Sequence, residues 1–180
     1  MKSYKTVLSE QIVVNGNIRS ENSNIDNNLI SEKIIKDLEK MVFEYPNFNY
    51  DIKTTYHAQH SWVYSLITEK IFLDHQIALN NHTTWSNVEG LNEISVKRNN
   101  IDLNKIEGNP HYTLIYIVKA GKNPGEFMIN YDTQHQKQLY YKFPIQEGNF
   151  YLFNSNIDYY LSKNYDEENR IYMTWTCHKR

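Results

Sequence analysis

The chain has 180 residues, of which 40% are hydrophobic and 22% are charged, and its formal net charge is −2. This composition fits one globular domain with a sizeable core, and the near-neutral charge excludes the broad cationic surface that nucleic acid or an anionic membrane would require. The single cysteine, Cys177, excludes an intrachain disulfide, and the fifteen tyrosines favour β structure.

Residues 1–90 predict a lead-in segment with two helices. The stretch "EQIVVNGNIRS" (10–20) predicts a strand that enters an Asn-Gly turn. In "SEKIIKDLEKMVFEY" (31–45), apolar residues recur at helical spacing and Ser31 suits the N-cap. A second helix is expected from about Thr68 to Asn80, where apolar residues again share one face.

From Glu93 onward the pattern changes to short strands separated by Gly and Pro turns. The predicted strands are "EISVKR", "YTLIYIVKAG", "GEFMINYD", "KQLYYKF", "GNFYLFN", "DYYLS" and "NRIYMTWTCH". Such a series predicts a sandwich or barrel, and helices that precede a run of strands favour an α+β arrangement. We therefore expect one mainly β domain over residues 1–180, with a jelly-roll core over 91–180.

The C-terminal half also carries an ordered set of short motifs: "TLIYIV", "PGEFMI", "PIQEG", "NFYLFNS" and "ENRIYMTWT". This order resembles the core of 2-oxoglutarate/Fe(II)-dependent oxygenases, and most closely the small prolyl-hydroxylase-like proteins of bacteria and tailed phages. The resemblance covers roughly Asp51 to Thr176. It implies a double-stranded β-helix, which is a cupin-like jelly roll, with the two N-terminal helices against one face.

The resemblance implies a metal site in which two histidines and one carboxylate hold Fe(II) and leave positions for 2-oxoglutarate and oxygen. The residues that match these three positions are Asn104, Ile106 and Tyr159. Ile106 has no ligand atom in its side chain, and Asn and Tyr are poor Fe(II) ligands beside His and Asp. A shifted register offers Asp102 or Glu107 as a carboxylate, without a neighbouring histidine. We therefore expect the metal-binding triad to be lost.

In this family a basic residue on the last core strand pairs with the far carboxylate of 2-oxoglutarate, and Arg170 matches that position. The planar fork of Arg170 suits bidentate carboxylate recognition. The hydroxyl of Tyr116, on the facing strand, is expected to add to the same site. A solvated or ion-paired strand residue is the alternative interpretation of Arg170.

A displaced metal site would need other histidines. His111 opens the strand that leads into the barrel and is the alternative ligand. His57 and His60 form a pair three residues apart, without a third ligand nearby in the sequence. The remaining histidines lie in polar or terminal settings or on a helix face and predict no site: His75, His82, His135 and His178.

Three functions stay open on these grounds. The first is a metal-free pseudo-oxygenase, which uses the oxygenase scaffold without a cofactor as a binding or structural module. The second is an active 2-oxoglutarate/Fe(II)-dependent hydroxylase with atypical ligands, such as His111. The third is a jelly-roll structural protein of the virion type.

The partners and the compartment follow from what the sequence contains. A pocket with Arg170 would bind a small carboxylate or a peptide, and a homo-oligomer is compatible with the sequence. No nucleic-acid or membrane partner is expected. Because no signal peptide and no stretch of about 20 apolar residues is recognised, the expected location is the cytoplasm, or the host cytoplasm for a phage-encoded protein.

Overall fold

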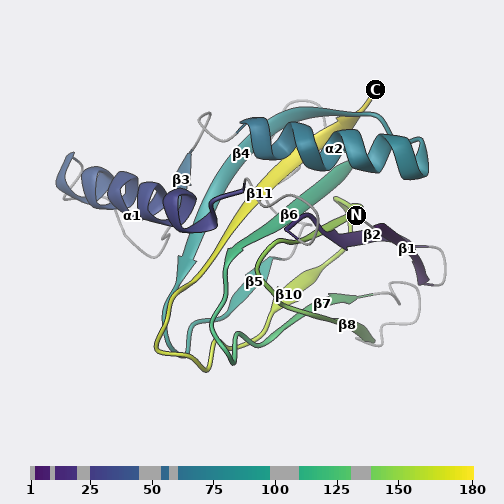
Figure 1. Ribbon diagram of the computed structural model, residues 1–180. Helices are drawn as coiled ribbons and strands as arrows, with labels where there is room; N and C mark the ends of the chain where they lie inside the picture. The colour runs from purple at the N-terminus through teal and green to yellow at the C-terminus, as the bar shows by residue number, and fades with distance from the viewer. Residues whose placement is uncertain are drawn as a thin grey trace.

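The computed structural model describes residues 3–8, 11–19, 25–44, 54–56, 61–97, 110–130 and 139–180. Within these ranges the chain forms two helices and two antiparallel sheets (Figure 1). No helix of the described residues is long and apolar enough to cross a membrane.

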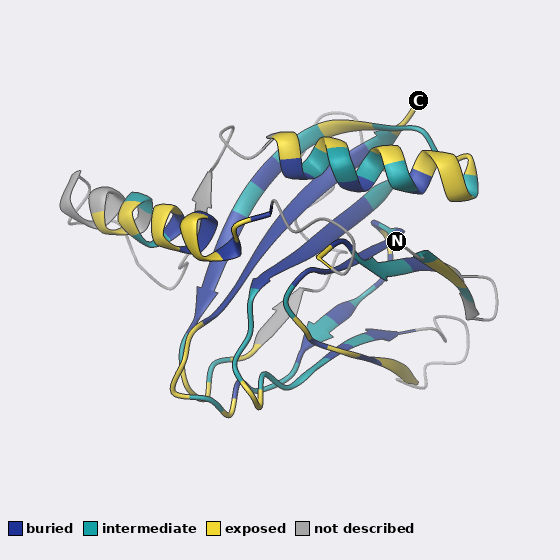
Figure 2. Cartoon of the chain, viewed as in Figure 1, coloured by how far each residue is buried: buried dark blue, intermediate teal, exposed yellow. Residues whose placement is uncertain are grey.

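The larger sheet has the strand order β1-β2-β9-β6-β11-β4-β3. Its strands are β1 (Ser3–Leu8), β2 (Gln11–Asn17), β3 (Thr54–Tyr56), β4 (Leu79–Glu89), β6 (Tyr112–Lys119), β9 (Asn149–Asn154) and β11 (Arg170–Lys179). The central strands β6, β9 and β11 are buried over almost their whole length (Figure 2). Strands buried on both faces read as continuous apolar runs, which is the pattern of "YTLIYIV".

The smaller sheet has the strand order β5-β10-β7-β8. Its strands are β5 (Ser95–Lys97), β7 (Glu126–Asn130), β8 (Tyr140–Pro144) and β10 (Tyr159–Leu161). Side chains from both sheets meet in one buried cluster, and the two sheets together form the predicted double-stranded β-helix. All seven predicted strands are present, which confirms the mainly β, α+β fold class.

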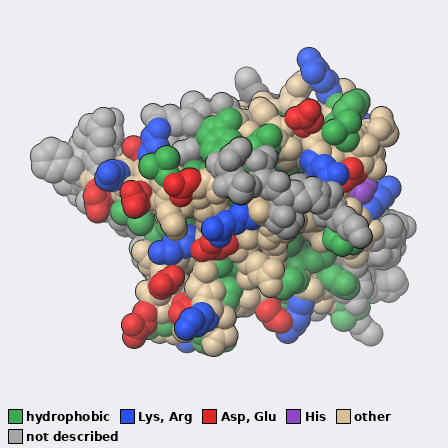
Figure 3. All heavy atoms as spheres, viewed as in Figure 1, with side chains coloured by type: hydrophobic (Ala, Val, Ile, Leu, Met, Phe, Trp, Pro, Cys, Tyr) green, Lys and Arg blue, Asp and Glu red, His purple; other side chains and the backbone are tan. Residues whose placement is uncertain are grey.

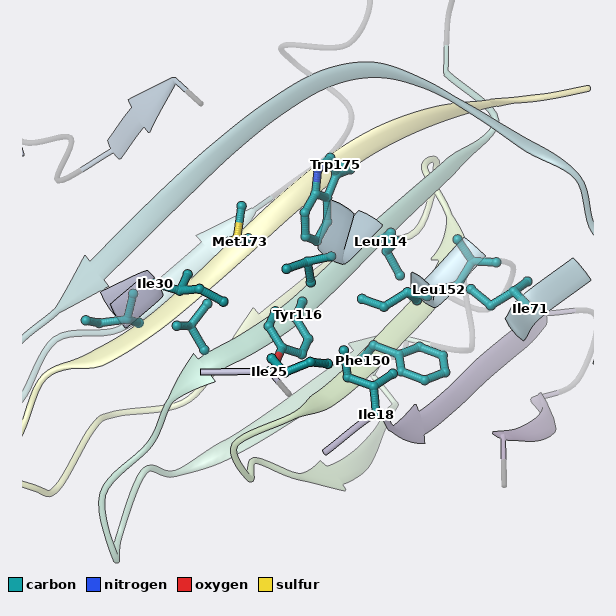
Figure 4. Close-up of a cluster of buried hydrophobic side chains, with 14 of the residues drawn as sticks. Ile18, Ile25, Ile30, Ile71, Leu114, Tyr116, Phe150, Leu152, Met173 and Trp175 are labelled. Carbon is teal, nitrogen blue, oxygen red and sulfur yellow. The ribbon is translucent and has the colours of Figure 1, made fainter. Parts of the chain in front are cut away.

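The helices α1 (Asn27–Glu44) and α2 (Ser61–His75) lie on the outer face of the larger sheet (Figure 1). Ile67 and Ile71 of α2 recur at helical spacing and are fully buried, as is Ile34 of α1. They belong to a core cluster with strand residues on the helix-covered face of the sheet, such as Leu114 and Trp175 (Figure 4). The larger sheet therefore has a helix-covered face and a face turned toward the smaller sheet.

The predicted start of the first helix was wrong. The helix begins at Asn27, because Oδ1 of Asp26 accepts hydrogen bonds from the backbone N–H groups of Asn28 (3.0 Å) and Leu29 (3.1 Å). Asp26 is therefore the N-cap. Ser31 lies inside the helix, where its hydroxyl donates to the carbonyl of Asn28 (2.8 Å).

The predicted second helix was also displaced. It ends at His75, because Gln76 adopts a left-handed φ of 57° and its N–H donates to the carbonyl of Phe72 (2.9 Å). The chain then enters β4, whose first two residues, Leu79 and Asn80, fall in the predicted helix and whose other residues were not predicted as a strand. Since β4 pairs with β11, the larger sheet includes residues before position 91.

The predicted Asn-Gly turn was wrong as well. Asn15 and Gly16 lie within β2, where they pair with Tyr4 and Ser3 of β1 on one side. On the other side they pair with residues of β9. The strand itself, Gln11–Asn17, is confirmed.

Candidate functional site

The space between the two sheets is filled by apolar and aromatic side chains. The ring centroids of Phe127 and Tyr151 lie 4.5 Å apart, and those of Phe153 and Tyr159 lie 5.1 Å apart. Ile115 and Ile117 of β6 belong to the same cluster and are fully buried. The centre of the barrel is therefore a packed aromatic core, formed in part by the residue at the predicted metal position.

Tyr159 lies on β10, the strand between β5 and β7, opposite Lys97 and Ile129. Its side chain is 2% exposed, and its hydroxyl has no hydrogen-bond partner among the described residues. Desolvation by burial, followed by the nearby charge of Glu89, raises the pKa of the Tyr159 phenol well above its usual range. The phenol is therefore neutral at physiological pH and is held by packing.

Arg170 belongs to a buried polar network at one end of this core. It lies directly opposite Glu89 of β4, and its Nε donates to Oε2 of Glu89 over 2.7 Å. Nη2 donates to the same oxygen. The other carboxylate oxygen, Oε1, accepts from the hydroxyl of Tyr172 (2.9 Å). Tyr172 shares this face because it lies two residues along β11 from Arg170.

The remaining donors of Arg170 hold two loops. Nη1 donates to the carbonyl of Ser162 (2.8 Å), after β10, and to the carbonyl of Pro124, before β7. The guanidinium is 0% exposed. A ligand carboxylate at Arg170 would have to displace Glu89 from the fork. The geometry matches the ion-paired interpretation of Arg170, with a structural role in joining four elements.

Tyr116 does not share a site with Arg170. Tyr116 pairs with Met173 on β11, and Met173 and Arg170 point to opposite faces of the sheet because they are three residues apart. Tyr116 lies in the core beneath the helices, where its hydroxyl donates to Oδ1 of Asn27 (2.7 Å). The structure therefore does not bring Tyr116 and Arg170 together in one site.

Four predicted positions lie outside the described residues: Asn104, Ile106, His57 and His60. The same holds for Asp102 and Glu107, the carboxylates of the shifted register. Of the three predicted metal positions, the structure therefore places Tyr159 alone.

His111 lies beside two other histidines, which sequence analysis had not connected with it. Its ring centroid is 5.8 Å from that of His178 on β11. The ring centroid of His178 is in turn 4.8 Å from that of His82 on β4. Both contacts are edge-to-face. Nδ1 of His111 accepts from the backbone N–H of Lys179 (3.2 Å). His82 occupies a β-bulge, because β4 pairs Thr83 with Thr176 and Asn81 with Cys177, leaving His82 between them.

The described residues do not fit Fe(II) with 2-oxoglutarate. A neutral phenol, packed between aromatic rings, stands at the one predicted metal position that the structure describes. The fork that would receive 2-oxoglutarate is bonded to Glu89. No group of three or more His, Cys, Asp or Glu in the described ranges is arranged to hold a metal ion, the three histidines included. No reaction through Fe(II) or 2-oxoglutarate follows from these side chains.

The fold is that of the 2-oxoglutarate/Fe(II) oxygenases, which confirms the predicted resemblance at the level of fold. A prolyl-4-hydroxylase from Pseudomonas putida superposes with a TM-score of 0.61 at 8% identity, over 96% of this chain and 95% of the other. The viral collagen prolyl hydroxylase vCPH from Paramecium Bursaria Chlorella virus-1 gives a TM-score of 0.58 at 13% identity, over 92% and 90% of the two chains.

A third structure is that of SnoK, a non-heme alpha-ketoglutarate-dependent carbocyclase from nogalamycin biosynthesis. It gives a TM-score of 0.60 at 10% identity, over 93% of this chain and 79% of the other. No protein-family model matches the sequence, and no curated protein matches it. At these sequence identities the similarity establishes the fold of the chain, and any chemistry has to be argued from its own residues.

Proposed function

We propose that this protein is a pseudo-oxygenase: an oxygenase-fold protein that holds neither Fe(II) nor 2-oxoglutarate and acts as a binding or structural module. Its contacts with other molecules are made through the outer surface and the rim of the barrel. The proposal rests on the fold together with the content of the barrel centre.

The observation that carries the proposal is the position of Tyr159. By the resemblance to the oxygenases, Tyr159 occupies the position of a metal-binding histidine. Here Tyr159 is 2% exposed, and its ring centroid lies 5.1 Å from that of Phe153 and 5.9 Å from that of Phe127. A metal at this place would require the aromatic core to open and the phenol to lose its proton in a desolvated site.

The network around Arg170 supports the same proposal. Glu89 already neutralises the Arg170 guanidinium. A dicarboxylate ligand would therefore find no unpaired positive charge to bind at Arg170. We therefore expect 2-oxoglutarate to leave the melting temperature unchanged, both with and without Fe(II).

The test measures metal content and turnover in the same folded preparation. The protein is loaded with Fe(II) under nitrogen, desalted and analysed for iron, then incubated with 2-oxoglutarate, ascorbate and air, and succinate is measured. We expect iron far below one equivalent per chain and no succinate above a protein-free control. An authentic 2-oxoglutarate hydroxylase, treated identically, shows that the assay works.

One equivalent of iron together with succinate formation would overturn the proposal and establish the active hydroxylase. In that case loss of the iron in His178→Ala would show that the histidines His82, His111 and His178 rearrange to bind it, whereas retention would place it elsewhere. A large, regular assembly of the folded protein without any ligand would instead favour the structural, virion-type role.

A further inference from the structure

The outward face of α2 carries large apolar side chains. Trp62, Phe72 and Leu73 expose 42%, 46% and 64% of their surface, and Figure 2 shows exposed residues along the outer side of this helix. The opposite face of the helix, with Ile67 and Ile71, is fully buried against the sheet. A helix that is apolar on both faces is typical of one that is covered on both sides.

A groove of about 470 Å³ lies beside this face, between α2 and the beginning of β4. Tyr64, Phe72 and Leu79 form its apolar part, and Glu69 and Arg180 supply one charge of each sign. Hydrophobic, acidic and basic side chains lie close together over this part of the molecule in Figure 3. The groove and the outer face of α2 form one continuous surface, because Phe72 belongs to both.

The two charges of the groove are exposed. Neither Glu69 nor Arg180 has an ion-pair partner among the described residues. Arg180 is fixed beside the groove by its backbone N–H, which donates to the carbonyl of Ala78 (2.9 Å). By contrast, Lys70 and Asp74 on the same helix already pair with each other over 2.8 Å. The groove therefore offers one free carboxylate and one free guanidinium next to an apolar surface.

We propose that this groove docks a second copy of the chain across a two-fold axis, with Glu69 of each protomer facing Arg180 of its partner. In a two-fold interface the same surface serves both partners, and each contact occurs twice. A patch that carries both signs is complementary to its own copy, whereas a partner of a single sign would leave one charge unpaired. The exposed Leu73 of each protomer would enter the groove of the other.

The apolar contacts and the charges have different roles in this interface. Burial of Trp62, Phe72 and Leu73 supplies the driving force, because removing apolar surface from water is the dominant favourable term in association. The exposed ion pairs add little affinity. They favour this register, since a shifted register leaves Glu69 and Arg180 without a partner of opposite charge. The inference does not depend on whether the barrel binds iron.

The experiment measures the mass of the full chain in solution by light scattering after size-exclusion chromatography. We expect the protein to have the mass of two chains. At a protein concentration near the wild-type dissociation constant, Glu69→Arg and Arg180→Glu should each shift the mass toward one chain, because the two like-charge contacts raise the dissociation constant at least about tenfold. Glu39→Arg, which reverses an exposed acid on α1, should leave the dimer unchanged.

A mixture of the two single variants gives the sharpest result. When Glu69→Arg protein is mixed with Arg180→Glu protein, both contacts of a heterodimer again join an arginine and a glutamate. The mixture should therefore recover the mass of two chains, although each variant alone remains a monomer. Leu73→Asp should abolish the dimer in every combination. Circular dichroism shows for each variant that the fold is kept.

The proposal is overturned by any of three results. One is a monomeric protein at the highest soluble concentration. Another is a dimer that persists unchanged in both charge variants, which would place the interface elsewhere. The third is failure of the mixed variants to associate, because pairing of Glu69 with Arg180 requires that they do.

Discussion

Arg170 and Glu89 form an ion pair in the interior of the protein, directly across from each other on β11 and β4. Nε and Nη2 of Arg170 both donate to Oε2 of Glu89. The two side chains are 0% and 7% exposed. Since both charges have left water, each depends on the other, and removing one leaves an uncompensated charge in the core.

The first prediction concerns this pair. Glu89→Gln keeps the shape of the side chain and removes its charge, so that the guanidinium stays buried without a counter-charge. We expect the free energy of unfolding to fall by about 3–5 kcal/mol, measured by urea denaturation at neutral pH.

The matched control is an exposed ion pair on the smaller sheet. Nζ of Lys142 lies 2.8 Å from Oε2 of Glu126, and the two side chains are 61% and 46% exposed. Lys142→Ala should therefore cost less than about 1 kcal/mol, because water solvates both charges. Similar small losses in the two variants would show that Arg170 and Glu89 are not coupled in the core.

The second prediction compares two buried tyrosines. The hydroxyl of Tyr159 has no partner among the described residues, whereas that of Tyr116 donates to Asn27 over 2.7 Å. Tyr159→Phe should leave the free energy of unfolding unchanged or raise it by up to about 1 kcal/mol, since it removes a desolvated polar group. Tyr116→Phe should lower it by about 1–3 kcal/mol, because Asn27 loses a buried bond.

Thermal and urea unfolding of both variants, beside the wild type, test this comparison. A marked loss of stability in Tyr159→Phe would mean that the hydroxyl holds a partner, and would weaken the view of Tyr159 as a packing residue. The two variants differ from the parent by the same single oxygen atom, which makes them controls for each other.

The strands of the C-terminal half could be predicted because their signal is local. From β6 to β11, short runs of β-branched and aromatic residues are separated by residues that favour turns. β4 could not be predicted in this way, because its sequence, "LNNHTTWSNVE", is largely polar. It is a strand because it pairs with β11 along its whole length, and such long-range pairing leaves no trace in local composition.

The candidate site was predictable only in part, for the same reason. The order of motifs along the chain singles out Tyr159, and an ion-paired side chain is one of the two interpretations of Arg170 that the sequence allows. Glu89, its partner, is 81 residues away in the sequence and lies at the end of the unpredicted strand. His82 was missed on the same strand. Both errors follow from the one missing strand, β4.

The third prediction is a loss of stability at alkaline pH. Desolvation raises the pKa of Cys177 from 9.0 to about 12, and likewise that of Tyr151 from 10.0 to about 12. The unfolded chain therefore loses these protons before the folded chain does. The stability that these groups contribute is fully present below about pH 9 and is lost as the pH rises toward about 12.

Urea midpoints between neutral pH and about pH 11 measure this loss. Cys177→Val, which keeps an apolar side chain of similar size, should move the onset upward by about one pH unit, to the range where tyrosine titrates. In the folded wild type, Cys177 should also resist thiol reagents at about pH 8, because the thiolate is the reactive form. Rapid labelling under native conditions would contradict the burial that raises its pKa.

The fourth prediction concerns Gly125, which joins Pro124 to the start of β7. Its φ is +80°, and a Cβ there would lie 2.5 Å from the carbonyl oxygen of Lys163. Gly125→Ala should therefore lower the free energy of unfolding by about 1–3 kcal/mol. Because the neighbouring carbonyl of Pro124 accepts from Arg170, the strain should spread into the network around Glu89.

Gly90→Ala is the control, since a Cβ at Gly90 would first meet Oδ1 of Asn169 at 3.6 Å, an ordinary contact. We expect it to change stability by less than about 1 kcal/mol. Thermal unfolding compares both variants, and the double variant Gly125→Ala with Glu89→Gln tests the coupling. If strain at Gly125 acts through Arg170, the two losses are less than additive. Simple addition would mean that the loop is strained independently of the ion pair.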